Sequence, residues 1–153
     1  MSTHQARSDS GKKLLRLFYV SAIVEPLTET GIEVILGQAQ MRNRRLDVTG
    51  MIAKSDGHFC QILEGRPEAV AAVMVRVQNS SCHRDIRVLL EEKVRQRRFA
   101  GWAMGLVVRD DMADQMRALH EGEAPPGPEL EAVIEELMNS TTGWPNPPHA
   151  SAL

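Results

Sequence analysis

The chain has 153 residues, of which 42% are hydrophobic and 25% are charged, and its formal net charge is −2. These values are ordinary for a globular protein of one domain with some appended structure. The small acidic net charge excludes the overall basic field that favours nucleic acid or anionic membrane. No apolar run approaches the roughly 20 residues that span a bilayer, and the polar start lacks the apolar segment of a secretory signal. We therefore expect a cytoplasmic protein that binds neither nucleic acid nor membrane.

The first elements are predicted from alternation and helical spacing. Residues 1–12 are polar and predict a flexible lead-in. Residues 13–22 alternate well enough for a strand, with one face turned toward a core. After a short loop, Thr30 and Glu33 match a capping box, which predicts a helix that begins at Thr30 and runs to about residue 44.

A hairpin, a second helix and two strands follow along the chain. Residues 46–65 predict a hairpin with its turn at 55–57. Residues 67–79 begin with a proline suited to a first helical turn and repeat apolar residues at helical spacing. Strands are predicted over 85–94 and 101–108. The order β-α-β-β-α-β-β predicts an α+β, ferredoxin-like sheet with two helices on one face.

The sequence changes character beyond Arg109. Apolar residues at helical spacing predict two short amphipathic helices within 110–139, separated by the break "EGEAPPGP". Helices this short are unstable alone, so we expect this C-terminal extension to cover the open face of the sheet or an oligomer contact. Residues 140–153 are Pro-rich and polar, which predicts a disordered tail.

The signatures of common enzymes and metal sites are missing from the sequence. It contains no GxxxxGK, GxSxG or HExxH motif. The histidines are scattered, and Cys60 and Cys82 form no CxxC or His-spaced pattern, so no metal site is predicted. Arginine clusters at 42–45 and 95–98 suit phosphates, but acidic neighbours of the second favour a solvated surface. Arg76 has the charge to meet the phosphate of a bound ligand.

One polar side chain stands inside a predicted strand. In "GHFCQILEG" (57–65), Gln61 shares a face with Phe59 and Leu63, and that face should point into a core. A buried amide without a partner costs roughly 1–3 kcal/mol. Gln61 is therefore either an ordinary core amide satisfied by its neighbours, or it serves a group that needs both a donor and an acceptor.

Possible partners of this amide lie on other predicted elements. Tyr19 occupies the inward face of the first strand, where its phenol could hydrogen-bond Gln61. Arg42 and Asn43 end the first helix, and Trp102 and Met104 are predicted on one face of the last strand. These groups, otherwise surrounded by Ile and Val, make a poor hydrolase and suit a slot for a flat ring with polar edges.

Four motifs in order identify a resemblance to a known family. They are "YVS" (19–21), "NRRLDVTG" (43–50), "GHFCQILEG" (57–65) and "RRFAGWAMG" (97–105). In this order and spacing they resemble the BLUF family, blue-light sensors that use a flavin. The match runs from about Leu14 to Gly105 and implies a flavin-binding domain over 13–109, with the flavin between the two helices.

The resemblance implies roles for individual residues. Tyr19 resembles the photochemical electron and proton donor, and Gln61 resembles the switching amide between that phenol and the N5/C4-carbonyl edge of the flavin. In the family, light leaves this amide rotated or tautomerised. Trp102 and Met104 match the pair linked to signal output. The implied flavin-binding residues are Tyr19, Ile35, Arg42, Asn43, Phe59, Gln61, Arg76 and Val77.

Within that set, the resemblance distinguishes the parts of the flavin. Asn43 resembles the asparagine at the other polar edge of the ring, Ile35 and Val77 resemble aliphatic walls, and Arg76 resembles a group near the ribityl-phosphate chain. The chain departs from the family at Arg42-Asn43, where many relatives have paired asparagines. It also departs at "NSSCH" (79–83), which ends at His83, because many members of the family have Asp-x-Arg-His there.

The resemblance also implies a cofactor and partners. FAD is the expected cofactor, with FMN or riboflavin as alternatives for the same ring slot. We expect a receptor rather than an enzyme, signalling through residues 110–139 to a separate and unidentified effector protein, and forming a homo-oligomer. Two alternatives remain open at this stage. One is a light-insensitive flavin-binding or regulatory module of the same fold. The other is a small acylphosphatase-like hydrolase, although the sequence shows no Gly-rich phosphate cradle for it.

Overall fold

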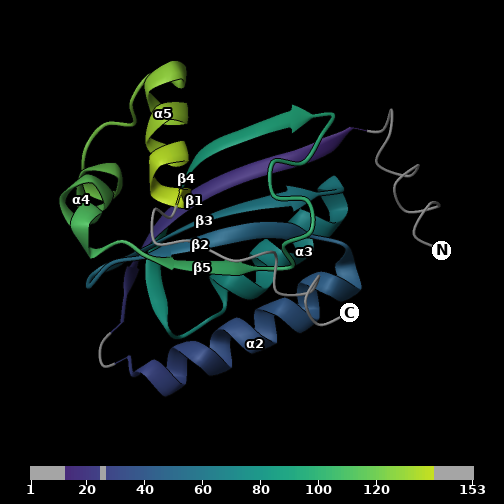
Figure 1. The fold of residues 1–153 in the computed structure, drawn as a ribbon, viewed down its shortest axis with the longest axis horizontal. Helices are drawn as coiled ribbons and strands as arrows, with labels where there is room; N and C mark the ends of the chain where they lie inside the picture. Colours follow the sequence, from purple (N-terminus) through teal and green to yellow (C-terminus); the bar gives the residue numbers. More distant parts are fainter. Residues whose placement is uncertain (1–12, 25–26, 140–153) are drawn as a thin grey trace.

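A five-stranded sheet lies at the centre of the computed structural model, which describes residues 13–24 and 27–139 (Figure 1). Neighbouring strands are antiparallel except β2 and β5, which are parallel. This arrangement confirms the predicted α+β, ferredoxin-like sheet. The lead-in predicted for 1–12 and the tail predicted for 140–153 lie outside the described residues. Along the chain, the strands are β1 (Leu14–Ile23), β2 (Thr49–Lys54), β3 (His58–Gly65), β4 (His83–Val94) and β5 (Gly105–Val108). Across the sheet, their order is β4-β1-β3-β2-β5.

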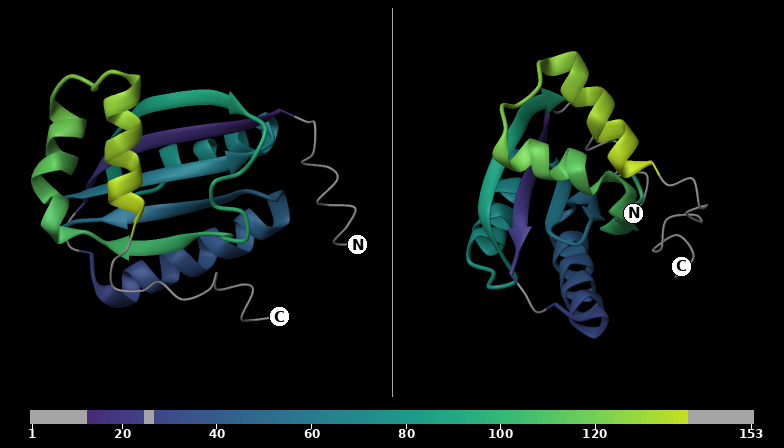
Figure 2. Two further views of the ribbon diagram at one scale, coloured as in Figure 1. Left: turned by 45° about the horizontal axis from the view of Figure 1, so that its top comes forward. Right: turned by 90° about the vertical axis from the view of Figure 1, so that its left-hand side faces the viewer.

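Helices cover both faces of this sheet (Figure 2). On one face lie α2 (Glu29–Leu46) and α3 (Pro67–Gln78), as predicted. On the other face, after a short 3-10 turn η1 (Asp110–Met112), lie α4 (Ala113–Glu121) and α5 (Gly127–Met138). The C-terminal extension thus covers the open sheet face within its own chain, which is one of the two outcomes predicted for it. None of the described helices is both long and apolar enough to cross a membrane.

β3 shows how one strand serves both faces. It lies between β1 and β2, and its successive side chains alternate between the two sides of the sheet. Gln61 and Leu63 face α2 and α3. Cys60 and Ile62 face α4 and α5, in the second core.

The core beneath α4 and α5 is rich in methionine and aliphatic side chains. Each such side chain contributes roughly 1.5–3 kcal/mol when fully buried, and the flexible methionines fill irregular gaps. This packing explains how two helices too short to be stable alone remain attached to the sheet. The helix side of this core consists of Met112, Met116, Leu119, Leu130, Ile134, Leu137 and Met138.

The first helix begins at a different cap from the predicted one. Thr28 is the N-cap residue, and its Oγ1 accepts a hydrogen bond from the N–H of Gly31 at 3.0 Å. The helix therefore starts at Glu29, and the capping box predicted from Thr30 and Glu33 is wrong. Thr30 lies inside the first turn, because Thr28 already satisfies the backbone donor three residues along.

The last strand is shorter than predicted. It begins at Gly105, so Trp102 and Met104 precede it in a loop and do not share a strand face. Met104 is buried with the core beneath α2 and α3, whereas Trp102 packs against the core beneath α4 and α5. Before β5, the carbonyl of Trp102 accepts from the N–H of Gly50 on β2, and the carbonyl of Ala103 accepts from the Asn43 side chain on α2.

Candidate functional site

A cavity of about 560 Å³ lies between α2, α3 and the sheet. This volume is within the roughly 300–1,000 Å³ range of small-molecule sites. Aliphatic side chains from α2, β2 and α3 form part of its wall, and polar side chains from β1 and β3 form another part. Seven of the eight residues predicted to bind a flavin line it, namely Tyr19, Ile35, Arg42, Phe59, Gln61, Arg76 and Val77.

Tyr19 and Gln61 lie directly opposite one another in the pairing of β1 with β3. The Tyr19 hydroxyl donates a hydrogen bond to Gln61 Oε1, as the sequence predicted for this pair. Each residue is only 3% exposed. Burial raises the pKa of Tyr19 far above its ordinary value, so the phenol keeps its proton and acts as the donor.

The other end of the Gln61 amide meets a sulfur atom. Gln61 Nε2 donates to Met104 Sδ at 3.3 Å, so the amide accepts from a phenol and donates to a thioether. A thioether is a weak acceptor and has no proton to give. The chain Tyr19–Gln61–Met104 therefore fixes which end of the amide points in which direction. It also places Met104, and not Trp102, beside the predicted switch.

Asn43 is the predicted site residue that the structure does not bring to the cavity. Its side chain is fully buried, and Nδ2 donates to the carbonyl of Ala103 at 2.8 Å. One turn earlier on α2, Gln40 Nε2 donates to the carbonyl of Met104 at 3.0 Å. Two amides of α2 thus hold the backbone beside Met104, which sequence reasoning did not foresee.

Arginines lie at one end of the cavity. Arg42 and Arg76 line it, and together with Arg45 they line an adjoining hollow of about 330 Å³ that also includes Gln38 and Met41. Burial and the positive charge of Arg76 lower the pKa of Arg42. Two like charges held together in this way favour an anionic group between them.

His83 belongs to the cavity but was not predicted as a site residue. Its Nε2 lies 3.1 Å from the carbonyl of Val77, and its Nδ1 lies 2.7 Å from Ser21 Oγ. A carbonyl only accepts, so Nε2 carries the proton and Nδ1 accepts from the serine hydroxyl. Burial lowers the pKa of His83, which keeps the ring neutral. The ring also lies edge-on to Phe59, with centroids 5.9 Å apart.

A sequence signal for His83 did exist. Ser21 follows Tyr19 by two residues, so strand alternation places its hydroxyl on the same inward face, where a buried polar group needs a hydrogen-bond partner. Gln38 gave no comparable signal, because a polar residue on a helix is ordinary. In residues 13–24 and 27–139, no group of three or more His, Cys, Asp or Glu side chains is placed to hold a metal ion.

The sequence model of one protein family matches residues 14–105, and that family is described as BLUF, sensors of blue-light using FAD. The chain belongs to the BLUF family. The match covers β1 to β4, α2, α3 and every cavity residue described above, and it stops at the first residue of β5.

Curated relatives of this BLUF chain include much longer proteins. The photoactivated adenylate cyclase subunit beta of Euglena longa is 24% identical over 130 residues, which are 84% of this chain and 14% of that protein. The blue light- and temperature-regulated antirepressor BluF of Escherichia coli (strain K12) is 33% identical over 93 residues, which are 61% of this chain and 23% of that protein. The BLUF chain thus spans less than a quarter of either relative.

Solved structures of small BLUF proteins share the fold. The dark-state structure of BlrB matches with a TM-score of 0.68 and 26% identity, over 82% of this chain and 94% of that chain. The photo-activated state of BlsA matches with a TM-score of 0.69 over 83% of this chain and 96% of that chain, and its 24% identity shows the fold alone.

The cavity fits the flavin that BLUF domains bind. Ile35 and Val77 offer aliphatic contact to a flat ring, and Gln61 lines the same space with an amide that both donates and accepts. The arginines at the end of the cavity suit a phosphate-bearing chain. The residues present therefore agree with the family, and the chain is a flavin-binding blue-light sensor domain.

Proposed function

We propose that Tyr19 and Gln61 form the light-driven switch of this receptor. The observation that carries the proposal is the buried hydrogen-bond chain from the Tyr19 hydroxyl through the Gln61 amide to Met104 Sδ, at the wall of the cavity. A bound flavin supplies the absorption of blue light and the capacity to take up an electron and a proton. Tyr19 is the donor of both, and Gln61 Oε1 is the acceptor that the phenol proton meets first.

The Gln61 amide has two arrangements of unequal stability. In the arrangement described here, Oε1 accepts from Tyr19 and Nε2 donates to Met104. A half-turn of the amide directs Nε2 toward the phenol oxygen, which can accept, and directs Oε1 toward a sulfur that cannot donate. One hydrogen bond is lost, worth about 0.5–1.5 kcal/mol net. A difference of this size suits a switch that returns to its starting arrangement in the dark.

An absorption spectrum before and after blue illumination tests this function. We expect a yellow purified protein whose flavin band shifts reversibly to longer wavelength, because the amide changes its hydrogen bond to the ring. A yellow protein without the shift would indicate a light-insensitive module. A colourless protein with no affinity for flavin would refute the receptor function altogether.

We propose FAD as the cofactor and assign its phosphates to the arginine end of the cavity. Arg42, Arg45 and Arg76 surround the hollow there, and hydrogen bonds to charged groups contribute roughly 1.5–3 kcal/mol. The family description names FAD, whereas one similar solved structure is that of Klebsiella pneumoniae BlrP1 with FMN and cyclic diGMP. Titrating the flavin-free protein with riboflavin, FMN and FAD should show tighter binding of the phosphorylated forms.

A matched variant separates phosphate binding from ring binding. Arg76→Gln should weaken FMN and FAD by about tenfold or more, by the same energy per hydrogen bond, and leave riboflavin affinity unchanged. Equal weakening of all three flavins would contradict the phosphate assignment. Chromatography of the flavin released from the purified protein identifies the natural cofactor directly.

We propose that residues 13–109 form the flavin-binding unit and that residues 110–139 carry the signal to a separate effector protein, without turnover by the chain itself. α4 and α5 support this, because α4 packs on β1 and β3, the strands that carry the switch, and α5 packs on the neighbouring β2, both from the opposite face. The names of the relatives include a photoactivated adenylate cyclase subunit and a blue light- and temperature-regulated antirepressor, so the output differs among them. The predicted homo-oligomer and cytoplasmic location stay predictions, and light scattering in darkness and light measures the oligomeric state.

A further inference from the structure

The segment of residues 97–104, which leads from β4 into β5, is tied to β3 at both of its ends. At one end, Met104 Sδ accepts from Gln61. At the other end, backbone N–H groups bind Glu64, which follows Gln61 by three residues on the same strand. The segment therefore spans from the amide switch to a carboxylate on the other face of the sheet.

Glu64 is a fully buried carboxylate with well-placed donors around it. Its Oε2 accepts from the N–H of Arg98 at 2.9 Å and from Arg16 Nε at 2.8 Å, and its Oε1 accepts from the N–H of Phe99 at 2.9 Å. Hydrogen bonds to an ionised acceptor are stronger than those between neutral groups. Because two of the three donors are backbone groups, the position of Glu64 fixes the backbone of the segment.

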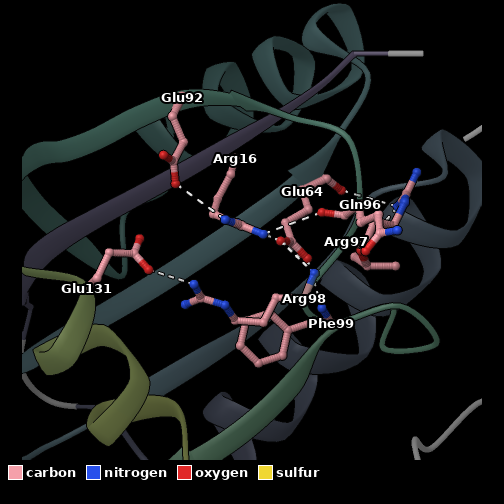
Figure 3. Close-up of polar contacts among 9 residues, drawn as sticks. Arg16, Glu64, Glu92, Gln96, Arg97, Arg98, Phe99 and Glu131 are labelled. Carbon is pink, nitrogen blue, oxygen red and sulfur yellow. Dashed lines mark hydrogen bonds and ion pairs between the residues drawn. The ribbon is translucent and has the colours of Figure 1, made fainter. Parts of the chain in front are cut away.

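The side chain of Arg98 continues from this point to α5. It lies 2.6 Å from Glu131 Oε2, and Figure 3 shows it crossing from the segment toward the helix. The other carboxylate oxygen, Oε1, is enclosed and has no hydrogen-bond partner. The two side chains are 31% and 38% exposed, so the ion pair adds little stability, but it is a direct contact between the segment and α5.

At the opposite end of the segment, residues 103 and 104 contact α2 and the Gln61 amide. The carbonyls of Ala103 and Met104 accept from Asn43 and Gln40. The Met104 side chain is the part in contact with Gln61, and a half-turn of that amide directs an oxygen at its sulfur. Two acceptors face each other in that arrangement, so the sulfur has to move or the amide oxygen has to find another donor.

We propose that Glu64 is a positioning residue that couples the Gln61 amide to α5, through the 97–104 segment and the Arg98–Glu131 ion pair. The inference rests on the proposed Tyr19–Gln61 switch and names the route of its output. Glu64 holds the far end of the segment, so a displacement that begins at Met104 reaches the Arg98 side chain instead of dissipating in a free loop. Coupling of this kind is reciprocal, so a change at Arg98 or Glu131 also alters the stability of the light-adapted arrangement.

The variant Glu64→Gln tests the coupling. It removes the charge and turns one acceptor oxygen into an NH₂ group that faces a backbone N–H. We expect bound flavin and a reversible red shift, since Tyr19 and Gln61 keep their contacts. The light-dependent change in amide hydrogen exchange over α5 should be lost, and dark recovery should change severalfold. An α5 response equal to that of the unaltered protein would overturn the inference, and so would loss of the red shift, because Glu64 would then act on the switch itself.

Two surface variants keep the test independent of the stability of Glu64→Gln. Arg98→Ala retains the backbone N–H that binds Glu64, and Glu131→Ala removes the partner on α5. Each should reduce the light-dependent exchange of α5, and the double variant should reduce it no further than one of them, because both break the same link. Additive losses would contradict the shared route.

A matched control comes from α4. Arg117→Ala breaks the exposed Arg117–Asp114 ion pair, which spans 2.8 Å within that helix, and should leave the α5 response unchanged. A loss as large as that of Arg98→Ala would overturn the inference. If the unaltered protein shows the red shift without any light-dependent exchange in α5, the coupling fails and the photochemistry stands. If it shows no red shift, the proposed switch fails first.

Discussion

The two faces of the sheet bury different kinds of side chains. The face beneath α2 and α3 encloses a phenol, an amide and a neutral imidazole beside a cavity, from Tyr19, Gln61 and His83. The face beneath α4 and α5 encloses methionines and aliphatic residues in its core, and the buried carboxylate of Glu64 lies on the same face. Both sets come from the same strands, whose side chains alternate. We call the face beneath α2 and α3 the ligand face. We therefore expect that substitutions can alter the ligand face and the face beneath α4 and α5 separately.

The largest expected effect concerns the ligand face alone. Tyr19→Phe removes the hydroxyl that donates to Gln61 Oε1, and with it the proposed donor of the photoreaction. We expect flavin to remain bound and the light-induced red shift to disappear completely. Difference absorption spectra measure this, and Gln61→Leu should give the same loss. A normal photocycle in Tyr19→Phe would contradict the donor role and the separation of the two faces.

The opposite face should respond in stability and not in colour. Ile134 is fully buried in the core beneath α4 and α5, and Ile→Ala in a core costs roughly 2–5 kcal/mol. Urea denaturation should show this loss for Ile134→Ala, while the red shift is retained. Val133→Ala, at a partly buried neighbouring position, is the control with a smaller loss. Disappearance of the red shift in Ile134→Ala would show that the faces are not separable.

A smaller effect distinguishes the helices of the two faces. α2 buries Ala39 and Asn43 and begins with a Thr28 cap, whereas α5 buries four residues and has no side-chain cap. α2 should therefore depend more on its first turn. Thr28→Ala should lower the free energy of unfolding by about 1 kcal/mol, and Thr30→Ala by less than about 0.5 kcal/mol. Equal losses in urea denaturation would restore Thr30 as the cap.

The smallest effect is a pH dependence shared by the two faces. Burial lowers the pKa of His83, and burial together with His120 lowers that of His58 beside α4. The unfolded chain then binds more protons than the folded protein below the ordinary histidine pKa of about 6.5, so stability falls as the pH decreases through that value. Urea midpoints at several pH values measure the slope.

Variants assign that slope to each face. His83→Gln should reduce the loss of stability at low pH by the contribution of the ligand face. His58→Gln should reduce it by the contribution of the face beneath α4. A slope in His83→Gln identical to that of the unaltered protein would show that the imidazole of the ligand face does not contribute.

Much of the fold was predictable because it depends on local periodicity. Alternation placed Tyr19 and Gln61 on inward faces of two strands, and the structure pairs them directly. The same reasoning wrongly extended the last strand over Trp102 and Met104. Alternation alone does not show that the carbonyl of Trp102 binds β2 and that the carbonyl of Met104 binds α2. Thr28 and Thr30 are equally good caps by residue type, and the choice between them depends on where the preceding chain arrives.

The site was predictable only in part for a similar reason. Seven of the eight residues that the resemblance implied line the cavity, whereas the contact of Asn43 with the carbonyl of Ala103 is a tertiary hydrogen bond that no spacing reveals. The roles of Glu64 and Arg98 were hidden too. A glutamate near the end of a strand and an arginine in a basic cluster are ordinary in sequence, and only the fold brings them together with α5.

The central position of β3 has a consequence for how this sequence can vary. Gln61 and Glu64 point to opposite sides of the sheet, and both depend on the count of residues between the hairpin turn and the strand end. Inserting or deleting a single residue upstream of Gln61 would exchange the two sides at every later position, placing the carboxylate in the cavity and the amide among methionines. A replacement in one alternating set therefore leaves the other set in place, whereas a change in the length of the strand would displace both sets at once.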